Sequence, residues 1–121
     1  TKTEPAIINV ASIASFVNFP FHGGYCASKA AAFSITQCAR IELQKKGINV
    51  HSINPGPIDT DMTKDVAMDK ASPEATAKII FDELERNVAD IFPDPTGAEM
   101  FALWRDDYRK LENMASEMFN N

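Results

Sequence analysis

The sequence lacks the features of a membrane-spanning or nucleic-acid-binding protein. No apolar run approaches the roughly 20 residues that a membrane span requires. The 121 residues carry 12 lysines and arginines against 17 aspartates and glutamates, a formal net charge of -5. Nucleic acids and anionic membranes both attract basic surfaces, so we expect neither as a main partner. A hydrophobic fraction of 45% and this length fit one small folded domain.

Cysteine is scarce, and the two copies are placed too far apart to pair. Cys26 and Cys38 fall within one predicted helix, where a rise of 1.5 Å per residue separates them by about 18 Å, beyond disulfide reach. We expect two free, buried thiols in a reducing compartment such as the cytoplasm, with a reactive thiol at Cys26 as the alternative. The histidines and acidic residues lack the spacing of metal ligands, so no metal site is predicted.

The hydrophobic pattern alternates between short apolar strands and longer helices. It predicts strands at 6–12, 48–54 and 88–92, and helices at 25–46, 73–87 and 98–119. Each connection is long enough to make the strands parallel with right-handed crossovers, which predicts an α/β fold. The first strand reads as buried on both faces. A sheet of three strands is thin, however, and its first strand would expose an apolar edge unless another strand pairs with it, so the pattern suggests half of a doubly wound domain.

The last predicted helix carries an apolar seam with spacings of three and four, formed by Phe101, Trp104, Tyr108, Leu111, Ala115 and Met118. The seam covers fewer than three heptads, too few to predict a coiled coil. Two interpretations stay open: the seam packs on its own domain, or it contacts a second subunit.

Tyr25 and Lys29 are candidates for a reactive pair, because residues four apart share one face of a helix. A neighbouring ammonium favours the phenolate form of tyrosine, and such a phenol can exchange protons near neutral pH. The pair alone is common by chance, but its context adds weight. Ser12 ends one buried strand and Pro55-Gly56 follows the next, and ligands bind at the carboxyl ends of strands in open α/β sheets.

Three segments in this order, NVASIAS, YCASK and NPGPIDTDM, resemble the motifs of the short-chain dehydrogenase/reductase family. The resemblance implies an NAD(P)-dependent oxidoreductase with a Rossmann-like fold, which interconverts a small carbonyl compound and its alcohol by hydride transfer. It implies that Tyr25 is the general acid or base and that Ser12 hydrogen-bonds the substrate oxygen. Lys29 would lower the pKa of Tyr25 and bind the nicotinamide ribose.

The same resemblance assigns a cofactor wall. Thr60 and the backbone of Ile58 would hold the nicotinamide carboxamide, and Pro55 and Gly56 would shape the surface against which the nicotinamide lies. Thr60 can also be explained as a turn or helix cap. The segment 64–70 is either a lid over the substrate or an ordinary solvated segment.

Two further residues complete the assignment. Ser12 and Ala14 would contact the substrate, next to an apolar pocket wall. Asn9 matches a family position that is mostly structural. Neither the identity of the substrate nor the choice between NAD and NADP follows from these residues.

The resemblance covers about 7–62, and the chain departs from the family in three respects. It lacks the Gly-rich strand–turn–helix that opens the family's dinucleotide site, the residue that selects NAD or NADP, and the catalytic Asn that many members carry on an earlier helix. We therefore expect the C-terminal half of a Rossmann-like doubly wound sheet, a single partial domain over 1–121, with the N-terminal half absent. The start at Thr1 also suggests a piece of a longer polypeptide.

Two hypotheses follow. The chain is the catalytic half of a cytoplasmic, homo-oligomeric NAD(P)-dependent oxidoreductase, or it is a non-catalytic fragment. In the second case it would act by association through its bare sheet edge and the helix that carries Trp104.

Overall fold

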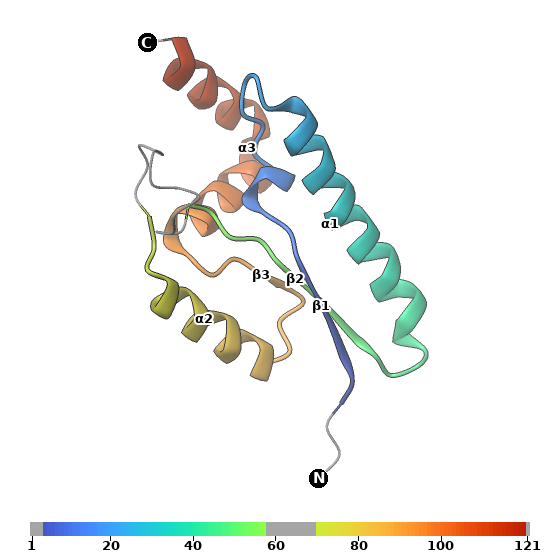
Figure 1. Ribbon diagram of the computed structural model, residues 1–121. Coiled ribbons are helices and arrows are strands. Elements are labelled where there is room, and N and C mark those ends of the chain that lie inside the picture. Colours follow the sequence, from blue (N-terminus) through green and yellow to red (C-terminus); the bar gives the residue numbers. More distant parts are fainter. Residues whose placement is uncertain (1–3, 58–69, 121) are drawn as a thin grey trace.

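The computed structural model describes residues 4–57 and 70–120. Within them, strands and helices alternate along the chain (Figure 1). The elements are β1 (Ala6–Val10), the short 3-10 helix η1 (Ile13–Ser15), α1 (Gly23–Gln44), β2 (Asn49–Ile53), α2 (Pro73–Glu85), β3 (Asp90–Ile91) and α3 (Pro95–Asn120). The predicted order of elements is confirmed.

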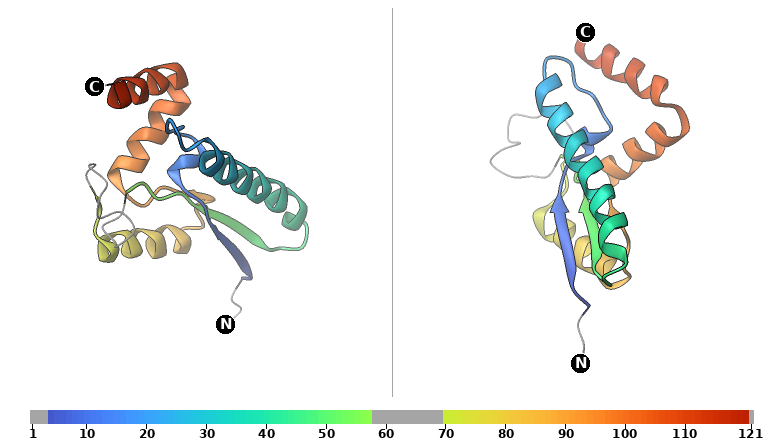
Figure 2. Two further views of the ribbon diagram at one scale, coloured as in Figure 1. Left: turned by 45° about the horizontal axis from the view of Figure 1, so that its top comes forward. Right: turned by 90° about the vertical axis from the view of Figure 1, so that its right-hand side faces the viewer.

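The three strands form one parallel sheet in the order β1-β2-β3. β1 and β2 pair over their full length, from Ala6 opposite Asn49 to Val10 opposite Ile53. α1 lies on one face of this sheet and α2 on the other (Figures 1 and 2). The chain moves in the same direction across the sheet from β1 to β2 and from β2 to β3, but the connecting helices α1 and α2 lie on opposite faces. The β1–α1–β2 and β2–α2–β3 crossovers therefore have opposite handedness. The expectation that every crossover is right-handed is therefore wrong for one of them.

β1 forms an open edge of the sheet. Ile7, Ile8 and Val10 are 40%, 45% and 66% exposed, and among the described residues only β2 pairs with β1. The expectation of an apolar edge is confirmed, whereas burial of β1 on both faces is wrong for this chain. The strand has the composition of a covered strand, but within the described residues no element covers its outer side.

Local signals place the helix ends close to their predicted positions. Ser72 caps α2, accepting a hydrogen bond from the Ala75 N–H at 3.1 Å, and Pro73 stands in the first turn. Gly47 follows α1 with a φ of +70°, a conformation that glycine adopts without a steric penalty. Both features are local signals that lie within one turn of the helix end they mark.

The hydrophobic core joins η1 to α3. Phe16 sits at its centre, with ring centroids 4.8 Å from Phe33, 4.9 Å from Phe101 and 5.0 Å from Trp104, in edge-to-face arrangements. Leu111 belongs to the same buried cluster. The segment that follows Ser12 is thereby packed against the C-terminal helix.

α3 is bent rather than straight, and Figure 2 shows its two halves at an angle. Asp107 leaves the helical conformation at φ -156° and ψ 88°. Its Oδ1 accepts hydrogen bonds from the N–H groups of Arg109 and Lys110, at 3.1 and 3.2 Å, and so caps the second half. The seam predicted for this helix is therefore not continuous. Phe101 and Leu111 pack in the core, whereas the exposed members are Trp104, Tyr108 and Met118.

Both cysteines are free thiols, as predicted. Cys26 is buried, and its Sγ donates to the Val17 carbonyl at 3.7 Å and accepts from the Phe19 N–H at 3.5 Å. Cys38 is exposed, so its predicted burial is wrong. None of the described helices is both long and apolar enough to cross a membrane. Within 4–57 and 70–120, no cluster of three or more histidine, cysteine or acidic side chains is arranged to hold a metal ion.

Candidate active site

Ser12 stands two residues beyond β1, at the carboxyl end of the sheet. It caps η1: its Oγ accepts a hydrogen bond from the Ala14 N–H at 3.0 Å. A hydroxyl has one proton to donate and two lone pairs that accept, so this cap occupies an acceptor position only. The Ser12 O–H therefore keeps its capacity to donate to a ligand.

The backbone on both sides of Ser12 is fixed to the end of β2. The Ala11 N–H donates to the Ile53 carbonyl at 2.7 Å, and the Ile13 N–H donates to the Pro55 carbonyl at 2.9 Å. Ser12 lies between these two hydrogen bonds. The structure thus brings together the two strand ends that the sequence indicated, and it sets the position of Ser12 relative to the Pro55–Gly56 turn.

Tyr25 and Lys29 lie on one face of the first turns of α1, as their spacing predicts. The Lys29 Nζ is 5.7 Å from the centre of the Tyr25 ring, within cation–π range. Tyr25 is 53% exposed, so the phenol is open to a ligand. His22, directly before α1, makes no side-chain cap. Phe21 beside it is 94% exposed with a φ of +68°.

Side-chain hydrogen bonds join α1 to the strand that carries Ser12. The Ser15 hydroxyl donates to the Lys29 carbonyl at 2.8 Å. Farther along, the Asn9 Nδ2 donates to the Thr36 Oγ1 at 3.0 Å, and Thr36 is fully buried. Asn9 therefore connects β1 to the middle of α1, a structural contact of the kind the resemblance implied for it.

The Pro55–Gly56 turn contacts a residue that the sequence analysis missed. The Gly56 N–H donates to Oδ1 of Asp94 at 2.7 Å, and the Gly97 N–H donates to Oδ2 of the same side chain at 2.9 Å. The segment 93–97 falls between the predicted strand 88–92 and the predicted helix 98–119. Asp followed by Pro resembles Ser72-Pro73 and could have indicated a helix cap, but the contact with Gly56 spans 38 positions and leaves no local signal.

Four of the positions singled out in the sequence remain, namely Ile58, Thr60, the segment 64–70 and Ala14. Ile58 and Thr60 lie outside the described residues, as does nearly all of 64–70. Ala14 is only 2% exposed, and its N–H is the group that holds Ser12.

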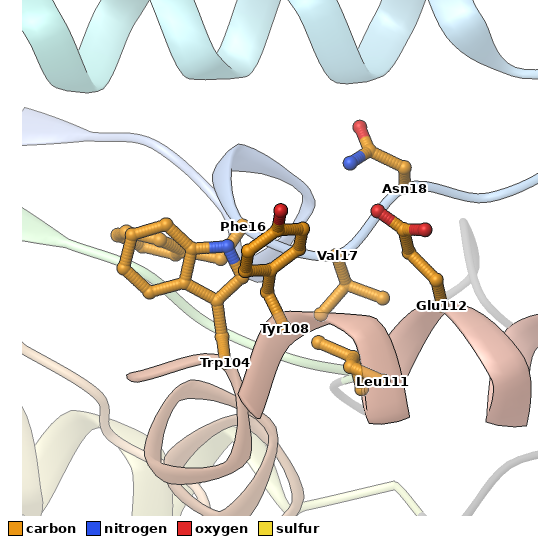
Figure 3. Close-up of a pocket in the computed structure, with 7 residues that line it drawn as sticks. All are labelled: Phe16, Val17, Asn18, Trp104, Tyr108, Leu111 and Glu112. Atoms are coloured by element: carbon orange, nitrogen blue, oxygen red, sulfur yellow. The ribbon is translucent and has the colours of Figure 1, made fainter. Parts of the chain in front are cut away.

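Two cavities lie between the loop after η1 and α3. The smaller, about 30 Å³, has room for about one water molecule and is shown in Figure 3, where Tyr108 and Trp104 of α3 face the loop. The larger, about 250 Å³, is mainly apolar and includes Phe19, Met100 and Met118. Neither cavity is lined by Ser12, Tyr25 or Lys29.

Residues 1–71 match the family model of short chain dehydrogenases. The chain belongs to this family. The resemblance seen in its three motifs is thereby confirmed.

Named dehydrogenases and reductases are similar to part of the chain. An inactive 2-(S)-hydroxypropyl-CoM dehydrogenase 2 of Xanthobacter autotrophicus is 36% identical over 78 residues, which are 64% of this chain and 34% of that protein. An L-xylulose reductase of Caenorhabditis elegans is 42% identical over 64 residues, which are 53% of this chain and 26% of the reductase. This short-chain dehydrogenase chain therefore spans only part of its relatives.

Solved structures extend the likeness to nearly the whole chain. A short chain dehydrogenase from Burkholderia cenocepacia, in complex with NADP, superimposes with a TM-score of 0.84 at 33% identity. That match covers 91% of this chain and 48% of the other. A short-chain dehydrogenase from Sphingobium yanoikuyae, in complex with NADPH, gives a TM-score of 0.71 at 18% identity and supports the fold alone. The predicted Rossmann-like α/β class, present as about half of the family's domain, is confirmed.

Proposed function

We propose that this chain is the proton-transfer half of an NAD(P)-dependent oxidoreductase that interconverts a small carbonyl compound and its alcohol. The observation that carries the proposal is the position of Ser12 at the end of β1. Its backbone neighbours are hydrogen-bonded to the end of β2, and its hydroxyl retains a donor beside the helix that carries Tyr25 and Lys29. Family membership supports an oxidoreductase.

The chemistry assigns one proton to Tyr25. A bound nicotinamide supplies the hydride to the carbonyl carbon in reduction and takes it back in oxidation. As the carbonyl oxygen gains negative charge, the Tyr25 hydroxyl gives it a proton, and in oxidation the Tyr25 phenolate removes that proton from the alcohol. The exposed ring of Tyr25 suits this exchange, because a substrate oxygen can reach the phenol.

Ser12 and Lys29 support this transfer in different ways. The Ser12 O–H donates a hydrogen bond to the substrate oxygen and stabilises its developing charge. Ala14 contributes through its backbone N–H, which holds the Ser12 Oγ at 3.0 Å. The Lys29 ammonium places a positive charge beside the Tyr25 ring and has donors for the ribose hydroxyls of the cofactor.

The residues present fit the nicotinamide end of a dinucleotide. We propose that Pro55 and Gly56 form the wall against the nicotinamide ring and that Ile58 and Thr60 hold its carboxamide. The described residues include no Gly-rich strand–turn–helix for the phosphates. Relatives of known structure are described with NADP, NADPH and NADH, and we propose NAD or NADP without choosing between them.

The exposed edge of β1 indicates where the rest of the cofactor site belongs. We propose that 1–121 is one partial domain and that a dinucleotide-binding half pairs with β1 and covers Ile7, Ile8 and Val10. The chain covers 48% of the Burkholderia protein, which leaves room for such a half. Two free thiols agree with a cytoplasmic location, and we propose a homo-oligomer there.

Replacing Ser12 tests this function. In the full-length polypeptide that contains these residues, Ser12→Ala should lower kcat roughly 100- to 1000-fold, because it removes a donor to the reacting oxygen. Ser34→Ala, an exposed serine of α1, is the matched control and should leave kcat unchanged. Nicotinamide-dependent turnover that survives Ser12→Ala intact would remove Ser12 from the mechanism.

A second candidate is association without catalysis, favoured by the open apolar edge of β1. A family relative named as inactive shows that membership alone does not establish turnover. This candidate predicts that the 121 residues form oligomers and have no affinity for nicotinamide cofactors. Light scattering after size exclusion, combined with NADH and NADPH titration, separates the candidates, and cofactor binding at micromolar concentration would count against the second.

A further inference from the structure

Asp94 is a buried carboxylate with both oxygens committed to the backbone. The residue is 2% exposed and stands directly before α3. Its carbonyl accepts from the Ala98 N–H at 3.0 Å, and its Oδ2 accepts from the Gly97 N–H, so it caps the helix. A cap of this kind needs one side-chain oxygen. The other, Oδ1, reaches across to the Gly56 N–H at 2.7 Å.

The approach of the two segments is unusually close. A Cβ added to Gly56 would stand 2.5 Å from the Asp94 Oδ2 and 3.1 Å from the Gly97 nitrogen. A Cβ added to Gly97 would stand 3.0 Å from the Gly56 nitrogen. The turn after β2 and the start of α3 are thus in backbone contact, with a glycine required on each side.

This contact is connected to the rest of the site through Pro55. The Pro55 carbonyl accepts the N–H of Ile13, the residue after Ser12. Hydrogen bonds therefore run from the start of α3, through the turn, to the segment that positions the Ser12 hydroxyl. α3 is in turn held in the core, where the Phe101 ring packs on Phe16 and Phe92.

We propose that Asp94 is a positioning residue for the nicotinamide wall. Its carboxylate holds the Pro55–Gly56 turn against the start of α3. The position of α3 thereby determines the position of the surface on which the cofactor would lie. The inference rests on the proposed function for the identity of the ligand. The Gly56 N–H already has a partner in Asp94, so the residue acts on the cofactor through the shape and rigidity of the turn and touches no reacting atom.

Asp94→Asn separates this role from simple helix capping. Asparagine is a good helix cap and still has one side-chain oxygen. We expect that oxygen to stay with Gly97, while the amide NH2 faces the Gly56 N–H and cannot accept from it. The Gly56 amide should then exchange with deuterated solvent at least about tenfold faster, the loss expected for about 1.4 kcal/mol of hydrogen bonding. Asp106→Asn, an exposed change of the same charge on α3, is the control.

The functional measurement uses the full-length polypeptide. Asp94→Asn should raise the KM for the nicotinamide cofactor roughly tenfold while kcat changes far less, because the proton-transfer residues are untouched. A purely structural role would lower the folded fraction, and with it the apparent kcat, without moving KM. Asp106→Asn should move neither parameter.

The outcomes distinguish the two claims. If the wild type binds the cofactor and Asp94→Asn binds it equally well, the positioning role is wrong and the proposed function stands. Unchanged exchange at Gly56 would also overturn the role. If the wild type binds no nicotinamide cofactor, the proposed function fails, and the cofactor role of Asp94 fails with it, whatever the exchange rates show.

Discussion

The Ser15 hydroxyl donates a hydrogen bond to the main-chain carbonyl of Lys29 at 2.8 Å. Ser15 ends η1, which Ser12 caps, and Lys29 lies one turn after Tyr25 in α1. One side chain thus joins the two segments that carry the proposed proton-transfer residues. The position of the phenol relative to the Ser12 hydroxyl depends on this contact and on the packing of Phe16 against Phe33.

Ser15→Ala should weaken this connection. Loss of one part-buried hydrogen bond costs about 1 kcal/mol in the free energy of unfolding, measured by urea denaturation. In the full-length polypeptide kcat should fall several-fold as well, because Ser12 and Tyr25 lose part of their alignment. Ser15→Thr keeps a hydroxyl donor and should recover most of both losses. Equal behaviour of the alanine and threonine variants would show that the hydroxyl does not matter.

The glycines provide a second test, because their surroundings differ. Gly56→Ala places a methyl group against the Asp94 carboxylate and should destabilise the protein by about 1–3 kcal/mol. Gly24→Ala meets open space in the first turn of α1 and should stabilise it by about 0.5–1 kcal/mol. Thermal unfolding of the two variants should give shifts of opposite sign, and shifts of the same sign would contradict the described turn.

Arg40 is expected to be the most important cation for stability in the described sheet. It contacts the Val50 and Ala89 carbonyls and forms a 2.6 Å ion pair with Asp90, so it joins α1 to both β2 and β3. Arg40→Ala should cost about 1–3 kcal/mol of unfolding free energy. Arg109→Ala, which loses an exposed pair with Glu112, is the control and should cost no more than about 1 kcal/mol. Similar losses for both variants would contradict this assignment.

The open edge of β1 should drive association of the 121-residue chain. Val10→Lys places a charge on this edge, and edge charges oppose strand pairing between molecules. The variant should shift the mass measured by light scattering toward the monomer. Phe81→Lys changes an equally exposed apolar residue on α2 and should leave the mass as it is. If Phe81→Lys dissociates the oligomer instead, the contact lies away from the sheet edge.

Much of the fold could be predicted from local sequence signals, and the predictions that were wrong have physical causes. Ser72-Pro73 and Gly47 mark helix ends through their own backbone chemistry, so they can be read in sequence. The bend at Asp107 was not predicted, because the apolar spacing of the sequence continues across it. The bend arises where the Asp107 carboxylate competes with the helix for two N–H groups. The burial of β1 was predicted from its apolar composition, but Ile7, Ile8 and Val10 are exposed, because no element within the described residues covers the outer side of the strand.

Part of the candidate site could also be predicted, because some of its residues lie in local sequence patterns. Ser12, Tyr25 and Lys29 follow from motif spacing and from the rule that ligands bind at strand ends. Asp94 did not follow, because its contact with Gly56 depends on how α3 returns to the sheet. Contacts distant in the sequence leave no periodic pattern, whereas helix faces and caps do.

Tyr25 is the proposed proton donor and acceptor, and the second tyrosine of the chain offers a matched control. Tyr25→Phe removes only the hydroxyl and should lower kcat/KM of the full-length polypeptide about 100- to 10,000-fold with a nicotinamide cofactor and a carbonyl substrate. Tyr108→Phe makes the same change on α3, beside a cavity that neither Ser12 nor Lys29 lines, and should keep wild-type turnover. Wild-type kcat/KM in Tyr25→Phe would show that Tyr25 does not transfer the proton.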